Sequence, residues 1–456
     1  MKKTLYFILF LLIISCKKES VVPIIINQPP VVVVPPVVVV PPTSPYTLTT
    51  TVMSGFSVPN FTNDIVAKGV NLAIPGVILY QKDNIEHLII PATLFYTYPL
   101  IPTLHLTKTN NNWSYENSYS DASMGCGRNY TCIDTTKQSW VFSDSGPELN
   151  NQPWPYGNLI LMKTEGSKVS FSNISTVNSY YHSVSSGDIN NDGLTDVIGL
   201  HMGTKGTNYL GLHVYTQNSN GSFKEDINFF DVSDFYSGRA GGAVLIQDLY
   251  GDSRPEIVRG DYGFNPTFQK PKDRYSVSIF SYNSTIGKYK LDKDPGPLGI
   301  FKTDDRGSTS IKAADFNKDG NIDLAIATEG TNYNGIEIWN GDGKGNFVPS
   351  NNRLDYTFDQ LQFREFDIID FDKDDYPDII LHGWSGKLLK TGNSLNINKL
   401  FWKNNNGVMG DYNKGLDIPK ITPAYVKVFN INNKLTFLAL NGNLDGTITI
   451  NEIVVN

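Results

Sequence analysis

The stretch Asp188-Ile-Asn-Asn-Asp-Gly-Leu-Thr-Asp196 has oxygen-bearing side chains at its first, third, fifth and ninth positions and a glycine at its sixth. In a short loop of this kind, alternate side chains point inward and the backbone carbonyl of the seventh residue adds another oxygen. Gly193 allows the sharp turn, because glycine readily adopts positive φ. The pattern therefore predicts a loop that wraps a hard cation.

The motif recurs along the chain every 55 to 67 positions. Asp315-Phe-Asn-Lys-Asp-Gly-Asn-Ile-Asp323 is a full copy, and Asp370-Phe-Asp-Lys-Asp-Asp-Tyr-Pro-Asp378 has Asp375 where the glycine is expected. Asp248-Leu-Tyr-Gly-Asp-Ser-Arg-Pro-Glu256 is an incomplete fourth copy. A repeat of this length indicates an array of similar supersecondary units.

The chain between the loops has the pattern of an all-β protein. Short apolar runs follow the loops at 197–200, 324–327 and 379–381, as expected for buried strands. Patterns with the helical period are scarce. Degenerate copies at the same spacing, around Asp83, Asp134 and Asn430, bring the count to seven units. Seven units of about four strands, closed in a ring, predict a seven-bladed β-propeller.

The last unit is short of strands. The residues after Asn430 supply only about half a blade, so we expect residues 46–58 to contribute the closing strand. An eight-bladed propeller is the alternative, and it needs a further turn near residue 400.

Residues 1–15 have the pattern of an export signal: Lys2 and Lys3, a short apolar run, then Ser15 before Cys16. The run is too short to span a bilayer. Ile13-Ile-Ser-Cys16 resembles a bacterial lipobox, which implies a lipid on Cys16, and residues 17–19 resemble a surface-display tag of Bacteroidetes-type lipoproteins. We expect an outer-membrane lipoprotein at the cell surface, with the periplasmic face as one alternative and an ordinary secretory signal as another.

Residues 16–45 comprise this cysteine and a linker rich in proline and valine, and residues 46–456 form the propeller domain. Paired prolines exclude helix and remove strand donors, so the linker should be extended.

Formal net charge is −7, and no basic stripe suggests a nucleic-acid partner. Outside the cytoplasm a disulfide between Cys126 and Cys132 is expected, with a metal or redox pair as the alternative.

The repeated loops, each followed by an apolar strand, resemble the FG-GAP or VCBS repeats of integrin α-subunit propellers and bacterial surface proteins. The stretches at 140–146 and 181–188 resemble segments that precede the repeats in such proteins. In that family the loop binds calcium between the first and second strands of a blade. All-oxygen ligands and flexible loops also favour calcium over zinc, copper or magnesium.

The resemblance implies three calcium sites, at Asp188, Asn190, Asp192 and Asp196; at Asp315, Asn317, Asp319 and Asp323; and at Asp370, Asp372, Asp374 and Asp378. The fourth loop, with Asp248, Asp252 and Glu256, departs at Tyr250 and Ser253. It should bind weakly or keep its turn through hydrogen bonds alone. Solvated turns without metal are the alternative for every loop.

A ligand would bind the upper face of the propeller, which is the face opposite the calcium loops. Cationic or imidazole side chains recur six to nine positions before the loops, at His182, Arg239, Arg306 and Arg364, and His201, His382 and Trp384 follow the second strands. Such a ring could clamp carboxylates or sulfates of an acidic polysaccharide. The alternative is that these arginines pair with acidic residues between blades.

Three functions are compatible with this pattern. The first is a binding or adhesion module for an extracellular glycan or protein, attached to the membrane only by its lipid. The second is a lyase-like polysaccharide enzyme with His182, His201 or His382 as base, although no Gly-x-Ser-x-Gly or His-Glu-x-x-His motif occurs. The third is a structural surface protein with no dedicated ligand.

Overall fold

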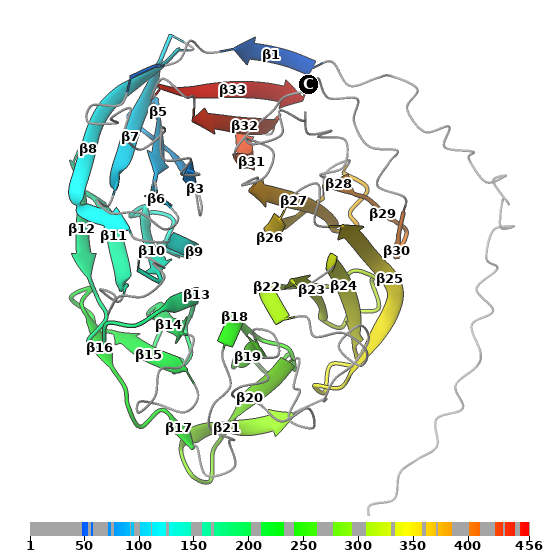
Figure 1. Ribbon diagram of the computed structural model, residues 1–456. Coiled ribbons are helices and arrows are strands. Elements are labelled where there is room, and N and C mark those ends of the chain that lie inside the picture. Colours follow the sequence, from blue (N-terminus) through cyan, green and yellow to red (C-terminus); the bar gives the residue numbers. More distant parts are fainter. Residues whose placement is uncertain are drawn as a thin grey trace, which may run out of the picture. The chain divides into compact units, whose positions relative to one another are not determined.

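The structure of the chain is a computed structural model (Figure 1). It describes residues 48–52, 56–57, 72–73, 77–91, 93–94, 101–110, 112–124, 127–146, 157–165, 168–201, 211–231, 241–261, 277–293, 307–329, 333–357, 362–370, 373–384, 401–410, 425–431, 434–442 and 447–455. The chain divides after Pro45, and all of these residues lie in the second unit, Tyr46–Asn456. The predicted signal peptide, Cys16 and the linker lie outside the described residues.

Every regular element in the described ranges is a β-strand. The prediction of an all-β chain is therefore confirmed. No helix among these residues is long and apolar enough to cross a membrane.

Most strands form antiparallel sheets of consecutive strands. The first two sheets are β4 (Ile78–Lys82), β5 (Ile85–Ile90), β7 (Ile101–Thr109) and β8 (Asn112–Met124); and β9 (Gly127–Asp134), β10 (Ser139–Asp144), β11 (Leu159–Glu165) and β12 (Lys168–Asn173). The next two are β13 (Tyr181–Gly187), β14 (Asp196–His201), β15 (Leu212–Gln217) and β16 (Phe223–Glu225); and β18 (Gly241–Gln247), β19 (Glu256–Asp261), β20 (Val277–Asn283) and β21 (Lys288–Lys293), with β17 (Phe230–Asp231) parallel to β21. The fifth sheet is β22 (Gly307–Ala314), β23 (Asp323–Glu329), β24 (Tyr333–Gly341) and β25 (Phe347–Thr357).

The remaining strands complete the ring. The largest sheet contains β26 (Gln362–Ile369), β27 (Asp378–Trp384), β28 (Phe401–Trp402), β31 (Tyr425–Ile431), β32 (Lys434–Gly442), β33 (Thr447–Val455), β1 (Leu48–Val52) and β2 (Phe56–Ser57). Two short pairs are β29 (Asn404–Asn405) with β30 (Val408–Met409), and β3 (Leu72–Ala73) with β6 (Thr93–Leu94). Within the second unit the sheets radiate from a central axis, and β9, β13, β18 and β22 lie innermost (Figure 1).

The closing strand comes from the start of the second unit. β1 pairs with β33 in antiparallel register, from Leu48 opposite Val455 to Val52 opposite Asn451, and β2 pairs with the beginning of β33. This confirms that residues 46–58 donate the strand that the last sheet lacks. A ring closed by its two chain ends leaves no long unpaired edge at the join.

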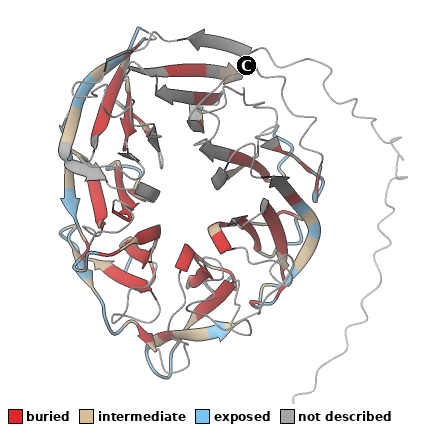
Figure 2. Cartoon of the chain, viewed as in Figure 1, coloured by how far each residue is buried: buried red, intermediate tan, exposed pale blue. Residues whose placement is uncertain are grey.

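The core lies between neighbouring sheets, because both faces of a sheet are covered. All six residues of β14 are buried. Ile198 and Leu200 pack toward Val244 and Ile257 of the next sheet, whereas Val197 packs toward the preceding one. Among the residues that Figure 2 colours, the middle strands are mostly buried and the outer strands are more exposed. This explains the continuous apolar runs in the sequence.

Removing β1 tests the closure. A chain that begins at residue 53 keeps β2 and the pairing of β33 with β32, but it leaves the outer edge of β33 unpaired from Asn451 to Val455. We expect its melting temperature to fall by roughly 5 °C or more relative to a chain that begins at Tyr46, and we expect self-association through the open edge. Thermal unfolding and size-exclusion chromatography measure both effects. Equal melting temperatures and two monomeric species would show that β1 does not close the ring.

Candidate functional site

The four acidic loops occupy equivalent places in the fold. Each joins the first strand of a sheet to the second: β13 to β14, β18 to β19, β22 to β23 and β26 to β27. In each loop the first residue is half-buried, the fourth to sixth are exposed and the ninth is buried. In the third copy, Asp372 lies outside the described residues. The loops therefore present their first and fifth carboxylates to solvent while the ninth points into the sheet.

Backbone amides gather around the first carboxylate of every loop. In the first copy, Asp188 accepts hydrogen bonds from the amides of Asp192 at 3.0 Å and Gly193 at 2.8 Å, and Asp192 accepts one from Leu194 at 2.8 Å. The other three copies repeat this set with distances of 2.8 to 3.2 Å. Side-chain oxygens thus hold these turns, as Asp and Asn commonly do.

Two positions of each loop need left-handed backbone. In the first copy, φ is 61° at Asn191 and 84° at Gly193. The third copy reaches 67° at Asp375 without glycine, and the fourth has Gly251 at 70° and Ser253 at 70°. Asp and Asn tolerate this region better than most residues. The loop shape therefore survives the loss of the sixth-position glycine.

The ninth residue anchors the loop to the sheet. Asp196 accepts hydrogen bonds from the amides of Ile189 at 3.3 Å and of Gln217, on the third strand, at 2.8 Å. Asp323 makes the same two contacts, with Phe316 at 3.0 Å and Gly341 at 2.9 Å. Burial, and to a smaller extent the neighbouring loop carboxylates, raises the pKa of Asp196 to about 6. A nearby cation would therefore relieve unfavourable charge.

The donor chemistry of three loops fits calcium. Each carries three carboxylates and a further side-chain oxygen at the third position, and such hard oxygen donors suit Ca²⁺. In the described ranges, however, no three His, Cys, Asp or Glu side chains already lie together as a metal-binding group. The carboxylates of a loop would have to move toward an ion to share it.

Two side chains, Tyr289 of β21 and Asn404 of β29, join the four loops in pairs, and the sequence pattern did not predict these contacts. The Tyr289 hydroxyl lies 3.0 Å from the carbonyl oxygen of Ile189 and 2.8 Å from that of Pro255. The Asn404 amide donates to the carbonyl oxygens of Phe316 at 2.8 Å and Pro377 at 3.2 Å. In both cases one side chain ties the second residue of one loop to the eighth residue of the following loop.

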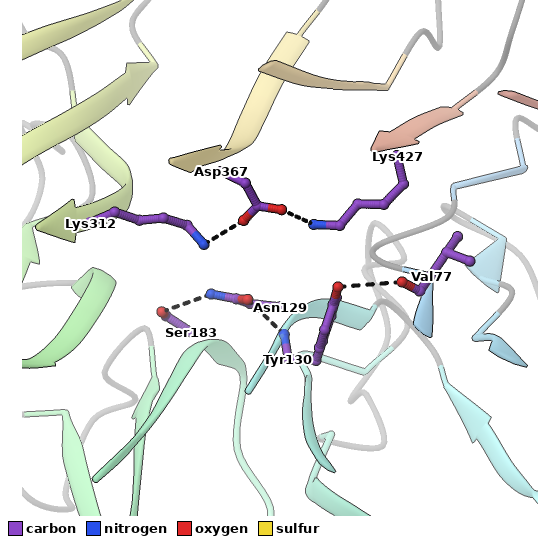
Figure 3. A network of polar contacts seen from close by, with 7 residues as sticks. All are labelled: Val77, Asn129, Tyr130, Ser183, Lys312, Asp367 and Lys427. Atoms are coloured by element: carbon purple, nitrogen blue, oxygen red, sulfur yellow. Dashed lines mark hydrogen bonds and ion pairs between the residues drawn. The ribbon is translucent and has the colours of Figure 1, made fainter. Parts of the chain in front are cut away.

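Paired charges lie between the innermost strands (Figure 3). Asp367 of β26 accepts hydrogen bonds from Lys312 of β22 at 2.7 Å and from Lys427 of β31 at 2.8 Å. Lys427 lies 5.5 Å from the ring centroid of Tyr130 on β9, and the Tyr130 hydroxyl donates to the carbonyl of Val77 at 3.3 Å. Asp367 is thus paired with two lysines from other strands. This part of the molecule therefore resembles a structural ion-pair network more than an open anion site.

The predicted ring of ligand-binding residues is described only in part. His182 on β13 and His201 on β14 are buried, so neither lies on an exposed rim, and their role in ligand binding stays a prediction. His201 lies among ring side chains of its own sheet instead. The other members lie outside the described side chains: Arg239, Arg306, Arg364, His382 and Trp384.

Cys132, on β9, is a half-buried free thiol in the structure. Burial is the main cause that raises its pKa. Cys126 lies outside the described residues, so the Cys126–Cys132 disulfide stays a prediction.

Residues 315–381 match the family model of the FG-GAP-like repeat. These residues thus carry an FG-GAP-like repeat, in a chain whose described strands form radial antiparallel sheets. The chain is also similar to the T-cell immunomodulatory protein homolog of Plasmodium yoelii yoelii. The two are 29% identical over 151 residues, which cover 31% of this chain and 19% of that protein. The chain thus spans about a fifth of the length of the curated relative that it matches.

Two solved structures are similar to the chain at low scores. A protein from Lactobacillus plantarum has 11% identity and a TM-score of 0.30, covering 66% of this chain and 92% of that one. The SapL1 lectin in complex with alpha methyl fucoside has 10% identity and a TM-score of 0.37, covering 83% and 96%. At these scores neither likeness supports a conclusion about function.

The loop contacts of Tyr289 predict a stability cost for Tyr289→Phe. The Tyr289 side chain is fully buried, and the variant removes the hydroxyl that contacts the Ile189 and Pro255 carbonyls. We expect the free energy of unfolding to fall by about 1–2 kcal/mol, measured by denaturant titration. Tyr282→Phe, opposite Tyr289 on β20, is the matched control and should cost less. Equal costs for the two variants would contradict a stabilising role for these contacts.

A buried histidine pair predicts sensitivity to acid. Nδ1 of His87 and Nε2 of His105 are 3.0 Å apart, and burial followed by the charge of His87 lowers the pKa of His105 to about 4. Between about pH 6.5 and 4 the unfolded chain takes up the proton and the folded chain does not. The contribution of His105 to the free energy of unfolding is therefore fully present above about pH 6.5 and is lost as the pH falls toward 4.

We expect His105→Gln to remove up to about 3 kcal/mol of this pH dependence. Unfolding titrations of both proteins at several pH values between 7 and 4 measure the difference. Parallel curves for the wild type and the variant would show that His105 is not held neutral by the fold.

Proposed function

We propose that this chain is a calcium-stabilised, seven-bladed FG-GAP-type propeller that acts as a binding or adhesion module for an extracellular glycan or protein. The observation that carries the proposal is the burial of all five described histidines, His87, His105, His182, His201 and His213. A general base must reach its substrate. Of the imidazoles that would serve a lyase, His182 and His201 are therefore enclosed, whereas the repeated loops expose their fourth to sixth residues.

The blade count rests on the repeat spacing and on the sheets. Five sheets of four or five strands precede β26, and the large sheet supplies two further units, β26–β28 and β31–β33 with β1. These units are joined where Gly383 and Trp384 pair with Val426 and Tyr425. Seven units are the simplest interpretation of this arrangement.

Calcium is proposed for the loops that begin at Asp188, Asp315 and Asp370. Its role is to neutralise the clustered carboxylates and to stabilise hairpins that neighbouring sheets clasp. The fourth loop keeps the same turn with Tyr250 at the third position, where its hydroxyl donates to Asp292 at 2.7 Å. The third residue of this loop therefore bonds to strand β21 of its own sheet.

Location is inferred from the sequence alone. A signal peptide over 1–15, a lipid on Cys16 and an extended linker to residue 45 would hold the propeller at the outer membrane, facing outward. The partner would then be an extracellular polymer or protein. The relative from Plasmodium is named for immunomodulation, which is compatible with a protein partner.

Calcium binding can be tested with two aspartates at the same loop position, one in a loop proposed to bind calcium and one in the fourth loop. Asp319 and Asp252 are the fifth residues of their loops, and each accepts a hydrogen bond from the seventh amide, at 2.8 Å and 2.9 Å. Isothermal titration of the wild type should give about three calcium ions per chain. Asp319→Asn should remove one, whereas Asp252→Asn should leave the number unchanged. No calcium uptake by the wild type would overturn the proposal.

Binding and catalysis are separated by one experiment. The chain from Tyr46 is mixed in calcium buffer with a panel of acidic and neutral polysaccharides, and both retention of the polymer and its chain length are followed. Retention without shortening supports the binding module. Shortening would replace it by the lyase-like enzyme, and if neither occurs on the panel, protein partners displace glycans as the ligand class.

A further inference from the structure

Two buried histidine pairs in this chain differ in how their ring nitrogens are satisfied. His87 and His105, on β5 and β7, bond to each other, and the second nitrogen of His105 lies 3.2 Å from the Tyr119 hydroxyl. His201 and His213, on β14 and β15, have ring centroids only 4.9 Å apart. No hydrogen bond joins these two rings, and three of their four nitrogens are buried without a partner.

Unpartnered polar atoms in an interior are costly. Both nitrogens of His201 and Nε2 of His213 are in this state, in side chains that are 0% and 4% exposed. A buried donor or acceptor that is left unsatisfied has lost its hydration without gaining a hydrogen bond in return. Such groups in a folded protein call for an internal water or an ion. The first pair differs, because three of its nitrogens have partners and none of the four is buried without one.

Glu225 on β16 orients one of the two rings. Its carboxylate lies 2.7 Å from Nδ1 of His213 and also accepts a hydrogen bond from Thr176. A carboxylate acceptor favours the tautomer with the proton on Nδ1, which leaves the lone pair on Nε2. Histidines that bind metals usually have such a carboxylate behind them. The contact therefore prepares Nε2 of His213 as a ligand.

The ring separation suits a shared ion. An ion about 2.0 Å from one nitrogen of each imidazole would lie about 3.2 Å from each centroid, and centroids 4.9 Å apart then subtend about 100° at the ion, close to the tetrahedral angle. We propose that His201 and His213 bind a divalent transition-metal ion of the kind that prefers imidazole, Zn²⁺ or Cu²⁺, with Glu225 as the positioning residue.

The described residues place no third His, Cys, Asp or Glu with this pair as a metal-binding group. On our proposal the described residues supply two ligands, and buried water completes the coordination. The site is separate from the calcium loops in place and in chemistry, since imidazole donors favour transition metals and the loop oxygens favour calcium. The proposal does not depend on the proposed function.

The test counts metal in the full-length chain, produced without an affinity tag in medium containing Zn²⁺ or Cu²⁺. Calcium is kept in all purification buffers to occupy the acidic loops, and metal content is measured after exhaustive dialysis. We expect about one transition-metal ion per chain in the wild type and in the control His105→Gln, and less than about a fifth of this in His201→Gln and His213→Gln.

A further variant separates positioning from ligation. Glu225→Gln keeps both imidazoles and should retain the ion with an affinity about 10- to 100-fold weaker, measured by competition with a chelator. A wild-type chain that retains no transition metal would overturn the proposal and leave a buried water as the partner. Equal metal content in the wild type and the two ligand variants would also overturn it, and the wild-type result stands even if a variant fails to fold.

Discussion

Each sheet in this chain has two apolar faces, and no sheet can cover both by itself. β14 shows the constraint most simply, because all six of its residues are buried and its two faces belong to different core clusters. Such a sheet is stable only between two neighbours, and a row of such sheets is stable only when its ends meet. The pairing of β1 with β33 provides this meeting point, so the whole ring depends on a strand from the start of the domain.

The acidic loops show how one type of side chain serves both the turn and the proposed ion. Carboxylates at the first, fifth and ninth positions each accept backbone amides, and this set is complete even where Tyr250 stands at the third position. The turn is therefore encoded by hydrogen bonds within the chain. On our proposal, the ion adds charge neutralisation to a shape that already exists, and Tyr289 and Asn404 pass that stabilisation to the adjacent sheets.

The sequence predicted the features that depend on local pattern. Strand periodicity and turn chemistry indicated an all-β ring, the four loops and the closing strand, because these are written in consecutive residues. It could not predict the loop contacts of Tyr289 or the ion pairs of Asp367 with Lys312 and Lys427, which join residues far apart in the chain. His201 shows the limit in the other direction. Its position at the end of a strand indicates which end of the sheet it occupies, but not whether other rings cover it.

We propose that calcium stabilises the folded propeller through the acidic loops. The most direct test compares thermal unfolding of the chain from Tyr46 in excess calcium and in excess chelator at fixed pH and ionic strength. Since an ion that binds only the folded state stabilises it by mass action, our account predicts a melting temperature several degrees lower in chelator, restored when calcium is added back. Identical melting curves in the two buffers, with no calcium in the purified protein, would contradict it.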